Sequence, residues 1–574
     1  MDLYDYRFAA YELDKAEQLL LREGQPVPLT PKAFAILLML IERSGHVVSK
    51  TDLMQAVWGD VCVEEANLTQ NIFILRRILG EGVDGKKYIE TVPRRGYRFV
   101  SPVSRILRSE TQPRSEDEQK KSIAVLPFAD GNLDGTFEYL ADGIAESIIN
   151  SLSELPQLRV MAWSAVSRYK GKDKDPREIG AELGVPNLLS GRLRTVDKKL
   201  IISVELVDVR GGWRVWGETF TCDATGLFVV QPQISKQISD ALKLKLTVDE
   251  RERLEKRYTE NSGAYLHYLK GRYHWAKYTK HGLETAIKCY RSAIELDPTY
   301  ALAHVGIADA YFRLSTTFLP PLKALPLAKA AAKTALEIDD DLAEAHASLG
   351  KVCLNLREFQ VAEAEIRRAL ELKEGYALAH LWYGTIHEQR CNLNEALRQK
   401  KLALKLDPLS LLTSVSLATT LWSMGDFEAA ERQLFEALEI DENFQTAYIV
   451  LALIQEQRKD YTLAIHTFEK AIQMGETSFL ASFLARVYAL FGNNERAHAL
   501  INESIAQAQT RHISPYSLAL AFAGSGDLVS AFLWFEKAYE EYDEWLAFIK
   551  QDLRLDGLRD DPRLVSLVNR VGLL

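Results

Sequence analysis

The period of hydrophobic and polar positions changes several times along the chain. Residues 1–105 mix short alternating runs with apolar stripes of helical period, which predicts strands and short helices. Residues 106–121 carry almost no apolar side chains after Leu107, and such a charged segment cannot bury a core, so a linker is predicted. Residues 122–247 alternate between strand-like and helix-like runs. From about residue 262 the pattern is Ala-rich and helical to the end.

The helical region repeats itself. Alanines recur every 34 residues at positions 362, 396, 430 and 464, and another alanine follows seven residues after each of them. A period of this length with small residues at helix crossings predicts stacked helix pairs, about eight of them over residues 262–545. Residues 546–574 are predicted to be capping helices, because Asp561-Pro562 can begin a short helix with one apolar face.

Within the first 105 residues the pattern predicts three helices followed by a hairpin. The helices are expected at residues 31–43, 50–58 and 65–79, and Ser49 is expected to cap the second. The strands are expected at residues 87–92 and 96–100.

The third predicted helix has a narrow apolar stripe of Leu68, Ile72, Leu75 and Leu79. At about 100° per residue, Gln70 and Arg77 point almost directly away from this stripe. Phe73 and Ile74 flank the outward direction, and Asn67 and Asn71 lie on one shoulder. A half-buried helix that presents amides and arginine outward can read base edges in the major groove. The alternative is an ordinary surface helix with two stray apolar residues.

Arg94, Arg95 and Arg98 lie within five residues at and after the predicted hairpin tip. Clustered arginine on a protruding hairpin suits contact with phosphate or the minor groove, although a charge cluster alone is usually only solvated. Residues 1–105 contain 14 Lys and Arg and 14 Asp and Glu, so this stretch is neutral and only its hairpin is locally basic.

Composition narrows the function classes. The net charge is −9, so most of the chain is not expected to touch DNA. The five cysteines show no CxxC spacing, so neither a zinc site nor a disulfide framework is predicted, and no cofactor is expected. No signal peptide and no apolar run of membrane-spanning length is seen, which predicts a cytoplasmic protein with no membrane contact.

The segments LTPKAF, VVSKTDLMQAVWGD, NLTQNIFILRRILG and YIETVPRRGYRFV resemble the winged-helix effector domain of OmpR/PhoB-type response regulators over residues 3–103. The resemblance implies that helix 65–79 is the recognition helix and that Asn67, Gln70 and Ile74 face the bases. It implies phosphate-side roles for Asn71, Phe73 and Arg76 and minor-groove contact for the hairpin arginines. Phe73 departs from the polar or basic residue usual at its position.

No receiver domain is seen before this module, so regulation by aspartyl phosphorylation in cis is not expected. The arrangement is similar to that of one-component regulators of the CadC and HilA kind, a bacterial class.

The middle region resembles the TolB N-terminal-like α/β domain over residues 122–247. The resemblance rests on IAVLPF, EYLADGIAESIINSLSELPQLRV and REIGAELGVPNLLSGRLR. From the pattern, strands are expected at the run SIAVLPF that begins at Ser122 and at residues 158–162, 201–209 and 213–221, with a helix over 137–155. No phosphate loop, metal cluster or nucleophile elbow appears, so no enzyme is predicted.

The repeats resemble tetratricopeptide (TPR) repeats, with another kind of helical solenoid as the alternative. In TPR stacking the first helix of each unit lines a concave groove that suits a protein or peptide. The resemblance places six residues in this groove, away from the packing seams, where replacement would cost little stability: Lys351, Asn355, Glu388, Gln389, Glu456 and Gln457.

The sequence therefore predicts a multidomain α+β transcription regulator with a winged helix-turn-helix, an α/β domain and an all-α TPR solenoid. Double-stranded DNA and a protein or peptide ligand are its expected partners, with RNA polymerase and a second copy on DNA as further candidates. The first rival is a TPR scaffold or co-chaperone whose N-terminal domain binds protein. The second is an enzyme with a catalytic middle domain.

Overall fold

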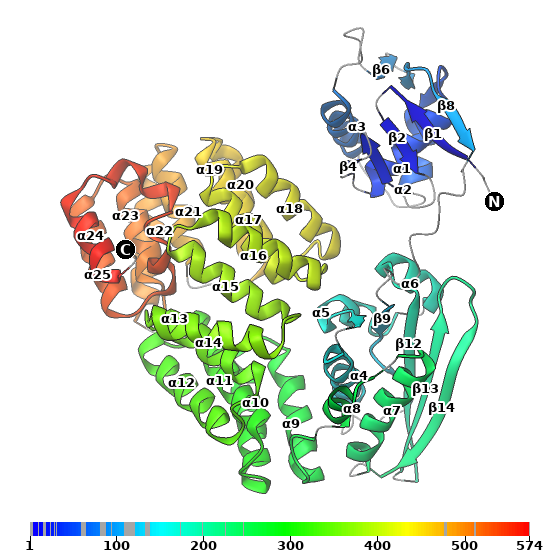
Figure 1. The fold of residues 1–574 in the computed structure, drawn as a ribbon. Helices are drawn as coiled ribbons and strands as arrows, with labels where there is room; N and C mark the ends of the chain where they lie inside the picture. Colours follow the sequence, from blue (N-terminus) through cyan, green and yellow to red (C-terminus); the bar gives the residue numbers. More distant parts are fainter. Residues whose placement is uncertain are drawn as a thin grey trace. The chain divides into compact units, whose positions relative to one another are not determined.

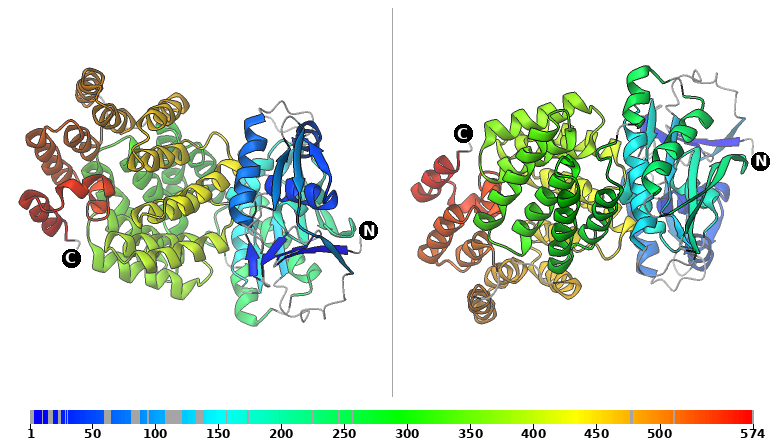
Figure 2. Two further views of the ribbon diagram at one scale, coloured as in Figure 1. Left: turned by 90° about the horizontal axis from the view of Figure 1, so that it is seen from above. Right: turned by 90° about the horizontal axis from the view of Figure 1, so that it is seen from below.

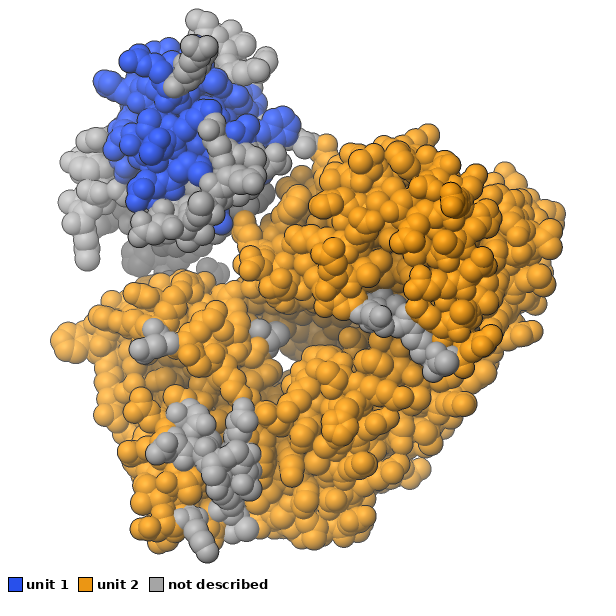
Figure 3. Space-filling view, turned by 180° about the vertical axis from the view of Figure 1, so that it is seen from behind, with its two compact units in different colours: residues 1–119 blue, residues 120–574 orange. Residues whose placement is uncertain are grey.

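The computed structural model divides into two compact units, residues 1–119 and residues 120–574, which are coloured separately in Figure 3. The structure describes residues 4–572 except 10, 15–18, 23–24, 28, 30, 59–64, 81–87, 93–94, 108–120, 132–137, 156, 173, 198, 224–225, 245, 256, 476–478 and 510–511.

The first unit begins with an antiparallel sheet in the order β4-β3-β2-β1-β8. Its strands are β1 Tyr4–Phe8, β2 Tyr11–Asp14, β3 Leu19–Arg22, β4 Gln25–Val27 and β8 Ser104–Leu107. Strand β8 corrects the predicted linker, because Ile106 and Leu107 pair with Asp5 and Tyr4 of β1. The predicted linker also extends one residue too far at its end, since Lys121 opens the first strand of the second unit.

Three helices follow, α1 Pro31–Glu42, α2 Lys50–Trp58 and α3 Glu65–Leu79, as the periodicity predicts (Figure 1). The Asp52 backbone N–H donates to Ser49 Oγ over 3.0 Å, which is the expected cap of α2. Strand β7 Gly96–Phe99 pairs with β6 Ile89–Val92 and with β5 Val47–Ser49, so the hairpin is the wing of a winged helix.

Gly96 allows the close pairing of β5 and β7. Its φ is 149°, and a Cβ at this position would collide with the carbonyl oxygen of Val48. The glycine of the GYRF motif is therefore required where the wing returns to the domain.

The second unit opens with a mixed sheet in the order β11-β9-β12-β13-β14, with β10 beside β12. Its strands are β9 Lys121–Val125, β10 Ala129–Asp130, β11 Leu158–Val160, β12 Asn187–Val196, β13 Lys199–Asp208 and β14 Arg214–Cys222. Helices α4 Glu138–Ser153 and α7 Leu227–Ala241 lie on one side of it (Figure 1). The short helices are α5 Trp163–Val166, η1 Ser167–Tyr169, α6 Pro176–Leu183 and α8 Val248–Glu255.

Strand β12 was not predicted, although it is central in the sheet. Gly191 interrupts its apolar pattern, and beyond Gly191 the arginines Arg192 and Arg194 flank Leu193. The glycine is needed because the Phe128 ring occupies the space of a Cβ. The alternation is present, but it is too short and too polar on one face to be recognised from the sequence alone.

The core of the α/β domain does not end at the predicted boundary of residue 247. Leu254 of α8 and Tyr265 and Leu269 of α9 Ser262–Trp275 join the same buried cluster. Tyr265 also donates its hydroxyl hydrogen bond to Ser147 Oγ of α4, over 3.2 Å. The first helix of the repeats is thus part of the packing of the α/β domain.

Among the described residues, helices α9 through α24 form eight consecutive pairs, as the repeat predicts. Beyond α9 they are α10 Lys280–Leu296, α11 Ala301–Thr317, α12 Pro321–Ile338, α13 Ala343–Asn355, α14 Phe359–Leu372, α15 Ala377–Gln389, α16 Leu393–Leu406, α17 Leu411–Ser423, α18 Phe427–Ile440, α19 Gln445–Gln457, α20 Tyr461–Met474, α21 Leu480–Leu490, α22 Asn494–Gln507, α23 Pro515–Gly524 and α24 Leu528–Glu540. Small residues mark the crossings: a Cβ on Gly350 would lie 2.7 Å from Ile366.

The chain then turns back into the array. The short helices η2 Glu544–Phe548 and η3 Leu553–Leu558 and the final helix α25 Pro562–Val571 follow α24. A Cβ on Gly572 would lie 3.7 Å from the ring of Phe359 at the start of α14. Figures 1 and 2 show these C-terminal elements beside the helices of the third repeat. The capping role predicted for residues 546–574 therefore extends to the inner side of the array.

A fully buried ion pair joins three consecutive helices of the array. Lys400 on α16 donates to Glu388 on α15 over 2.6 Å and to Thr420 on α17 over 2.8 Å. Lys400 is 0% exposed and Glu388 is 2% exposed. Burial lowers the pKa of Lys400, and Glu388 opposes that effect. Moving the two charges out of water costs desolvation free energy. Removing one partner destabilises the fold further, because it leaves the other charge buried and unpaired.

We expect Glu388→Ala to lower the free energy of unfolding by about 3–5 kcal/mol, because it leaves a buried ammonium without a counter-ion. The double variant Glu388→Leu with Lys400→Met should recover most of the loss. Denaturant unfolding followed by circular dichroism measures both.

The matched control is Glu371→Ala, which removes an exposed partner of Arg368 and should cost less than about 1 kcal/mol. Equal losses for Glu388→Ala and the control would contradict the importance given to the buried pair.

Candidate nucleic-acid interface

Helix α3 buries the apolar stripe that the sequence predicts. Its residues Leu68, Ile72, Leu75 and Leu79 are all buried in the core of the first unit, where α3 packs against α1. On the opposite side Phe73 is 59% exposed. The helix thus holds one face in the core and leaves the other accessible.

The predicted DNA-contacting residues of α3, which are the base-facing Asn67, Gln70 and Ile74, the phosphate-side Asn71 and the outward Arg77, are described only in part. Ile74 and Asn71 are half-buried within α3. Asn67, Gln70 and Arg77 lie on the described helix, but their side chains are outside the described residues. Their base-facing and outward roles therefore remain predictions.

Arg76 connects the third helix to the wing. Its Nε donates to the carbonyl oxygen of Ile89 over 3.1 Å, and its Nη2 donates to Thr91 Oγ1 over 2.6 Å. The guanidinium also lies over the Tyr97 ring, 5.9 Å from its centroid. Arg76 therefore fixes the position of β6 and β7 relative to α3. The sequence predicted only a phosphate-side role for Arg76 and not this structural one.

Tyr11 holds the other end of α3. It is fully buried on β2, and its hydroxyl donates to the carbonyl oxygen of Leu79 over 3.0 Å. Burial raises the pKa of this hydroxyl, so it stays a donor. Tyr11 packs in one aromatic cluster with Phe8, Tyr88 and Phe99. The N-terminal sheet, the helix end and the wing are thereby joined around one set of rings.

The wing arginines differ in what they contact. Arg98 donates to Glu90 across the β6–β7 pair, at 2.6 Å through Nη2, so its charge is already balanced. Arg95 is exposed in the turn, where its backbone N–H donates to the carbonyl oxygen of Val92. No ion pair links the Arg95 guanidinium to another described residue. Arg94 lies outside the described residues.

The predicted partner residues of the repeats do not line an open groove. Glu388, Gln389 and Glu456 are buried, at 2%, 3% and 3% exposure, so the expectation that they point away from the packing seams is wrong. Substitution of Glu388 or Glu456 will cost stability, because Glu388 pairs with Lys400 and Glu456 accepts from Arg486 Nε over 2.7 Å.

Lys351, Asn355 and Gln457 are half-buried. Lys351 forms an ion pair with Asp309 and lies over the Phe312 ring, and Asn355 donates to the Lys351 carbonyl oxygen over 3.1 Å. Lys351 and Asn355 therefore also have structural contacts, and a low stability cost is not expected for Lys351.

The C-terminal segment occupies the inner side of the array. Arg554 of η3 stacks on the Phe483 ring of α21 at 4.4 Å, and its carbonyl oxygen accepts from Arg486 over 3.0 Å. Trp545 of η2 packs against Phe483 and Phe479. Arg486, the partner of Glu456, is therefore held by a residue 68 positions further along the chain, which the local repeat pattern does not show.

Glu544 at the start of η2 is placed unfavourably for a charged group. Burial and the neighbouring Asp543 raise its pKa to about 8, against a lowering by Arg313. The pKa of Glu544 is higher in the folded than in the unfolded state. The contribution of its protonated carboxyl group to folding stability is therefore complete at low pH. It is lost as the pH rises from about 4.5 to about 8.

We expect Glu544→Gln to stabilise the folded chain relative to wild type at pH 8 and to match it near pH 4.5, because glutamine resembles the neutral acid. Denaturant unfolding at the two pH values measures the difference. A difference between the variants that does not change with pH would contradict the placement of Glu544.

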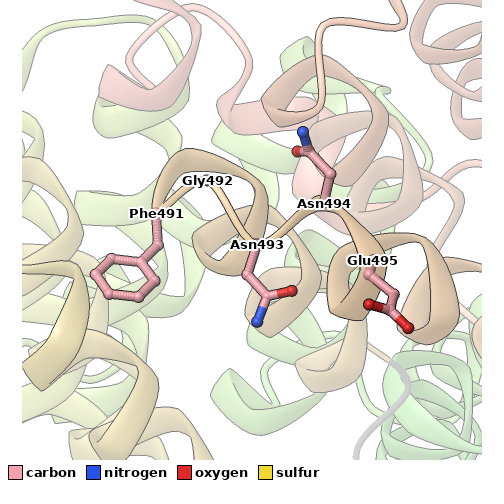
Figure 4. A pocket seen from close by; sticks show the side chains of 5 residues that line it. All are labelled: Phe491, Gly492, Asn493, Asn494 and Glu495. Carbon is pink, nitrogen blue, oxygen red and sulfur yellow. The ribbon is translucent and has the colours of Figure 1, made fainter.

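Other features of the described residues give weaker indications of a functional site. The pocket in Figure 4 is lined by residues 491–495, where α21 ends and α22 begins, and these five residues are too few to hold a ligand specifically.

Four of the cysteines are free thiols, and burial raises the pKa of Cys353 to about 12. Among the described residues, no group of metal-binding side chains is found. None of the described helices combines the length and apolar character needed to cross a bilayer.

Known proteins resemble the chain in three separate regions. Residues 24–99 match the family described as transcriptional regulatory protein, C terminal. Residues 119–237 match the second domain of HilA/YgeH-like transcriptional regulators. Residues 279–315 and 415–479 match tetratricopeptide repeats.

Individual relatives match the chain over different lengths. The transcriptional regulator HilA of Salmonella typhimurium is 27% identical over 551 residues, 94% of this chain and 95% of its own. The transcriptional activator CadC of Escherichia coli is 36% identical over 83 residues, 14% of this chain and 16% of its own. The solved DNA-binding domain of CadC is 30% identical with a TM-score of 0.17, covering 18% of this chain and 98% of that domain.

Proposed function

We propose that α3 and the wing together read a specific site on duplex DNA. The chain is a HilA-like transcriptional regulator with an OmpR/PhoB-type DNA-binding domain and TPR repeats. The observation that supports this proposal most directly is the outer face of α3. It carries an exposed Phe73, and the wing beside it presents an arginine with no counter-ion among the described residues. A helix of this kind fits the major groove, and the hairpin arginine fits the backbone or the minor groove.

The roles divide between base reading and positioning. We propose that Asn67, Gln70 and Ile74 contact base edges and that Asn71 and Phe73 lie at the edge of the groove, with Phe73 against a sugar or a thymine methyl. Arg77 is proposed as an outward contact of the same helix. Arg94 and Arg95 supply charge to the phosphates. Arg76 fixes the wing relative to α3 through Ile89 and Thr91, which sets the spacing between the two contacts.

The repeat array is proposed to bind a protein or peptide partner. Lys351, Asn355 and Gln457 remain candidates because they are only half-buried, whereas the buried Glu388, Gln389 and Glu456 are not. RNA polymerase and a second copy of the chain on DNA are candidate partners of the same kind. We propose that the protein acts in the cytoplasm and without catalysis of its own.

The first prediction for DNA binding concerns the wing. Arg94→Ala with Arg95→Ala should weaken binding to all duplex sequences similarly and should reduce the salt dependence of log K by about one to two units, since phosphate contacts release counter-ions. Fluorescence anisotropy of the full chain over a salt series measures the slope. Arg7→Ala, which removes an exposed arginine paired with Glu12, is the control and should leave the slope unchanged. An unchanged slope in the wing variant would refute the role of the wing.

The second prediction concerns base preference. Gln70→Ala should relax discrimination at one base pair by about 1–3 kcal/mol, if its amide binds adenine through two hydrogen bonds. Selection of bound duplexes from a random pool gives the preferred motif of each variant. The wing variant should keep the wild-type motif at lower affinity. If Gln70→Ala also returns the wild-type motif, its assignment to the bases is wrong.

A further inference from the structure

One face of the α/β sheet in the second unit is covered by helices α4 and α7, and the opposite face is largely open. Leu193 of β12 pairs with Ile202 of β13, and both are buried on the covered side. The neighbouring residues Arg192 and Arg194 point to the open side and are exposed. Helix α6 covers the open side only near the β12 start, where Gly180 packs against Val209.

Two glycines fix the arginines on this open face. A Cβ on Gly131 would lie 2.5 Å from Cγ of Arg194 and 3.2 Å from Cδ of Arg192, so both stems cross the space that this glycine leaves. A Cβ on Gly217 of β14 would collide with the guanidinium of Arg214. The stems of Arg192 and Arg194 and the guanidinium of Arg214 therefore lie along the sheet, while all three side chains stay exposed to solvent. We call Arg192, Arg194 and Arg214 the sheet arginines.

The sheet arginines have no counter-ion among the described residues. Some exposed arginines of the array, by contrast, are paired: Arg367 pairs with Glu363 and Arg398 pairs with Glu395. Glu205 of β13 lies on the open face, but its carboxylate accepts from Ser190 Oγ over 3.2 Å. Three unpaired positive charges on one rigid surface favour an anionic ligand.

The rest of the open face suits an extended polyanion better than a small anion or an acidic protein. The strands are nine to ten residues long, which corresponds to about 30 Å of surface. Between the arginines lie hydroxyls, and Ser203 and Thr219 are 3.2 Å apart. Hydroxyls and arginines are the usual donors to phosphate oxygens. Apolar side chains also lie on this face, Ile201 opposite Arg194 and Val207 opposite Arg214, but both are half-buried.

We propose that the sheet arginines bind the phosphate backbone of duplex DNA that flanks the site held by the winged helix. The inference rests on the proposed DNA binding, because the first contact brings the second surface to the same DNA molecule at high effective concentration. The second contact carries no base preference and lengthens the DNA segment that the chain occupies.

The test compares the full wild-type chain with the triple variant Arg192→Ala, Arg194→Ala, Arg214→Ala on two duplexes. Both carry the operator selected by the wild-type chain, one in about 20 base pairs and the other centred in about 60. On the long duplex the variant should show a salt slope lower by about two to three units and at least about tenfold weaker binding at low salt. On the short duplex wild type and variant should bind equally.

Two further variants test whether the effect comes from the positive charge of these arginines. The triple replacement of the same arginines by lysine retains charge and should retain the long-duplex slope, and Arg367→Ala with Arg398→Ala removes two paired arginines and should change nothing. Equal slopes for wild type and the alanine variant on the long duplex overturn the proposal, as does equal weakening on both duplexes in a variant that melts like wild type. If wild type binds neither duplex, the proposed function itself fails.

Discussion

The account of DNA binding depends on the burial of one narrow stripe of α3. Leu68, Ile72, Leu75 and Leu79 are each at most 3% exposed, and burying a side chain of this size is worth about 1.5–3 kcal/mol. Because a helix is rigid, fixing this stripe in the core also fixes which residues face outward. The Tyr11 hydrogen bond at the end of α3 and the two Arg76 hydrogen bonds to the wing then set the helix in place as one surface with the hairpin. Preorganisation of this kind reduces the entropic cost of binding DNA.

A different constraint shapes the repeats. Small residues at the helix crossings bring neighbouring helices together, and the curvature that results returns the C-terminal segment to the third repeat. The interior is therefore a site of buried charges with specific partners, among them Lys400 with Glu388 and Arg486 with Glu456. An array closed in this way exposes less of its inner surface to a peptide than an open solenoid does.

The pattern of apolar positions predicted the features that depend on residues close together in the sequence. The bounds of α3 agree with the apolar period, and the repeat count agrees with the 34-residue spacing. What the pattern missed depends on residues far apart in the sequence. Glu388 reads as a solvated position because its partners lie 12 and 32 residues further on, at Lys400 and Thr420. Strand β12 was missed because its identity comes from pairing with β9 and β13.

The candidate site was predictable to a similar extent. The stripe that points Phe73 outward is visible in the sequence, whereas the bridging role of Arg76 depends on where the wing folds. The proposed function requires that the chain recognises particular DNA sequences. Recovery of genomic fragments by the purified full chain at physiological salt tests this directly. The account predicts that a few discrete sites are enriched, with affinity about 10³–10⁷ above bulk DNA. Recovery of fragments in proportion to their abundance, or no recovery, would contradict it.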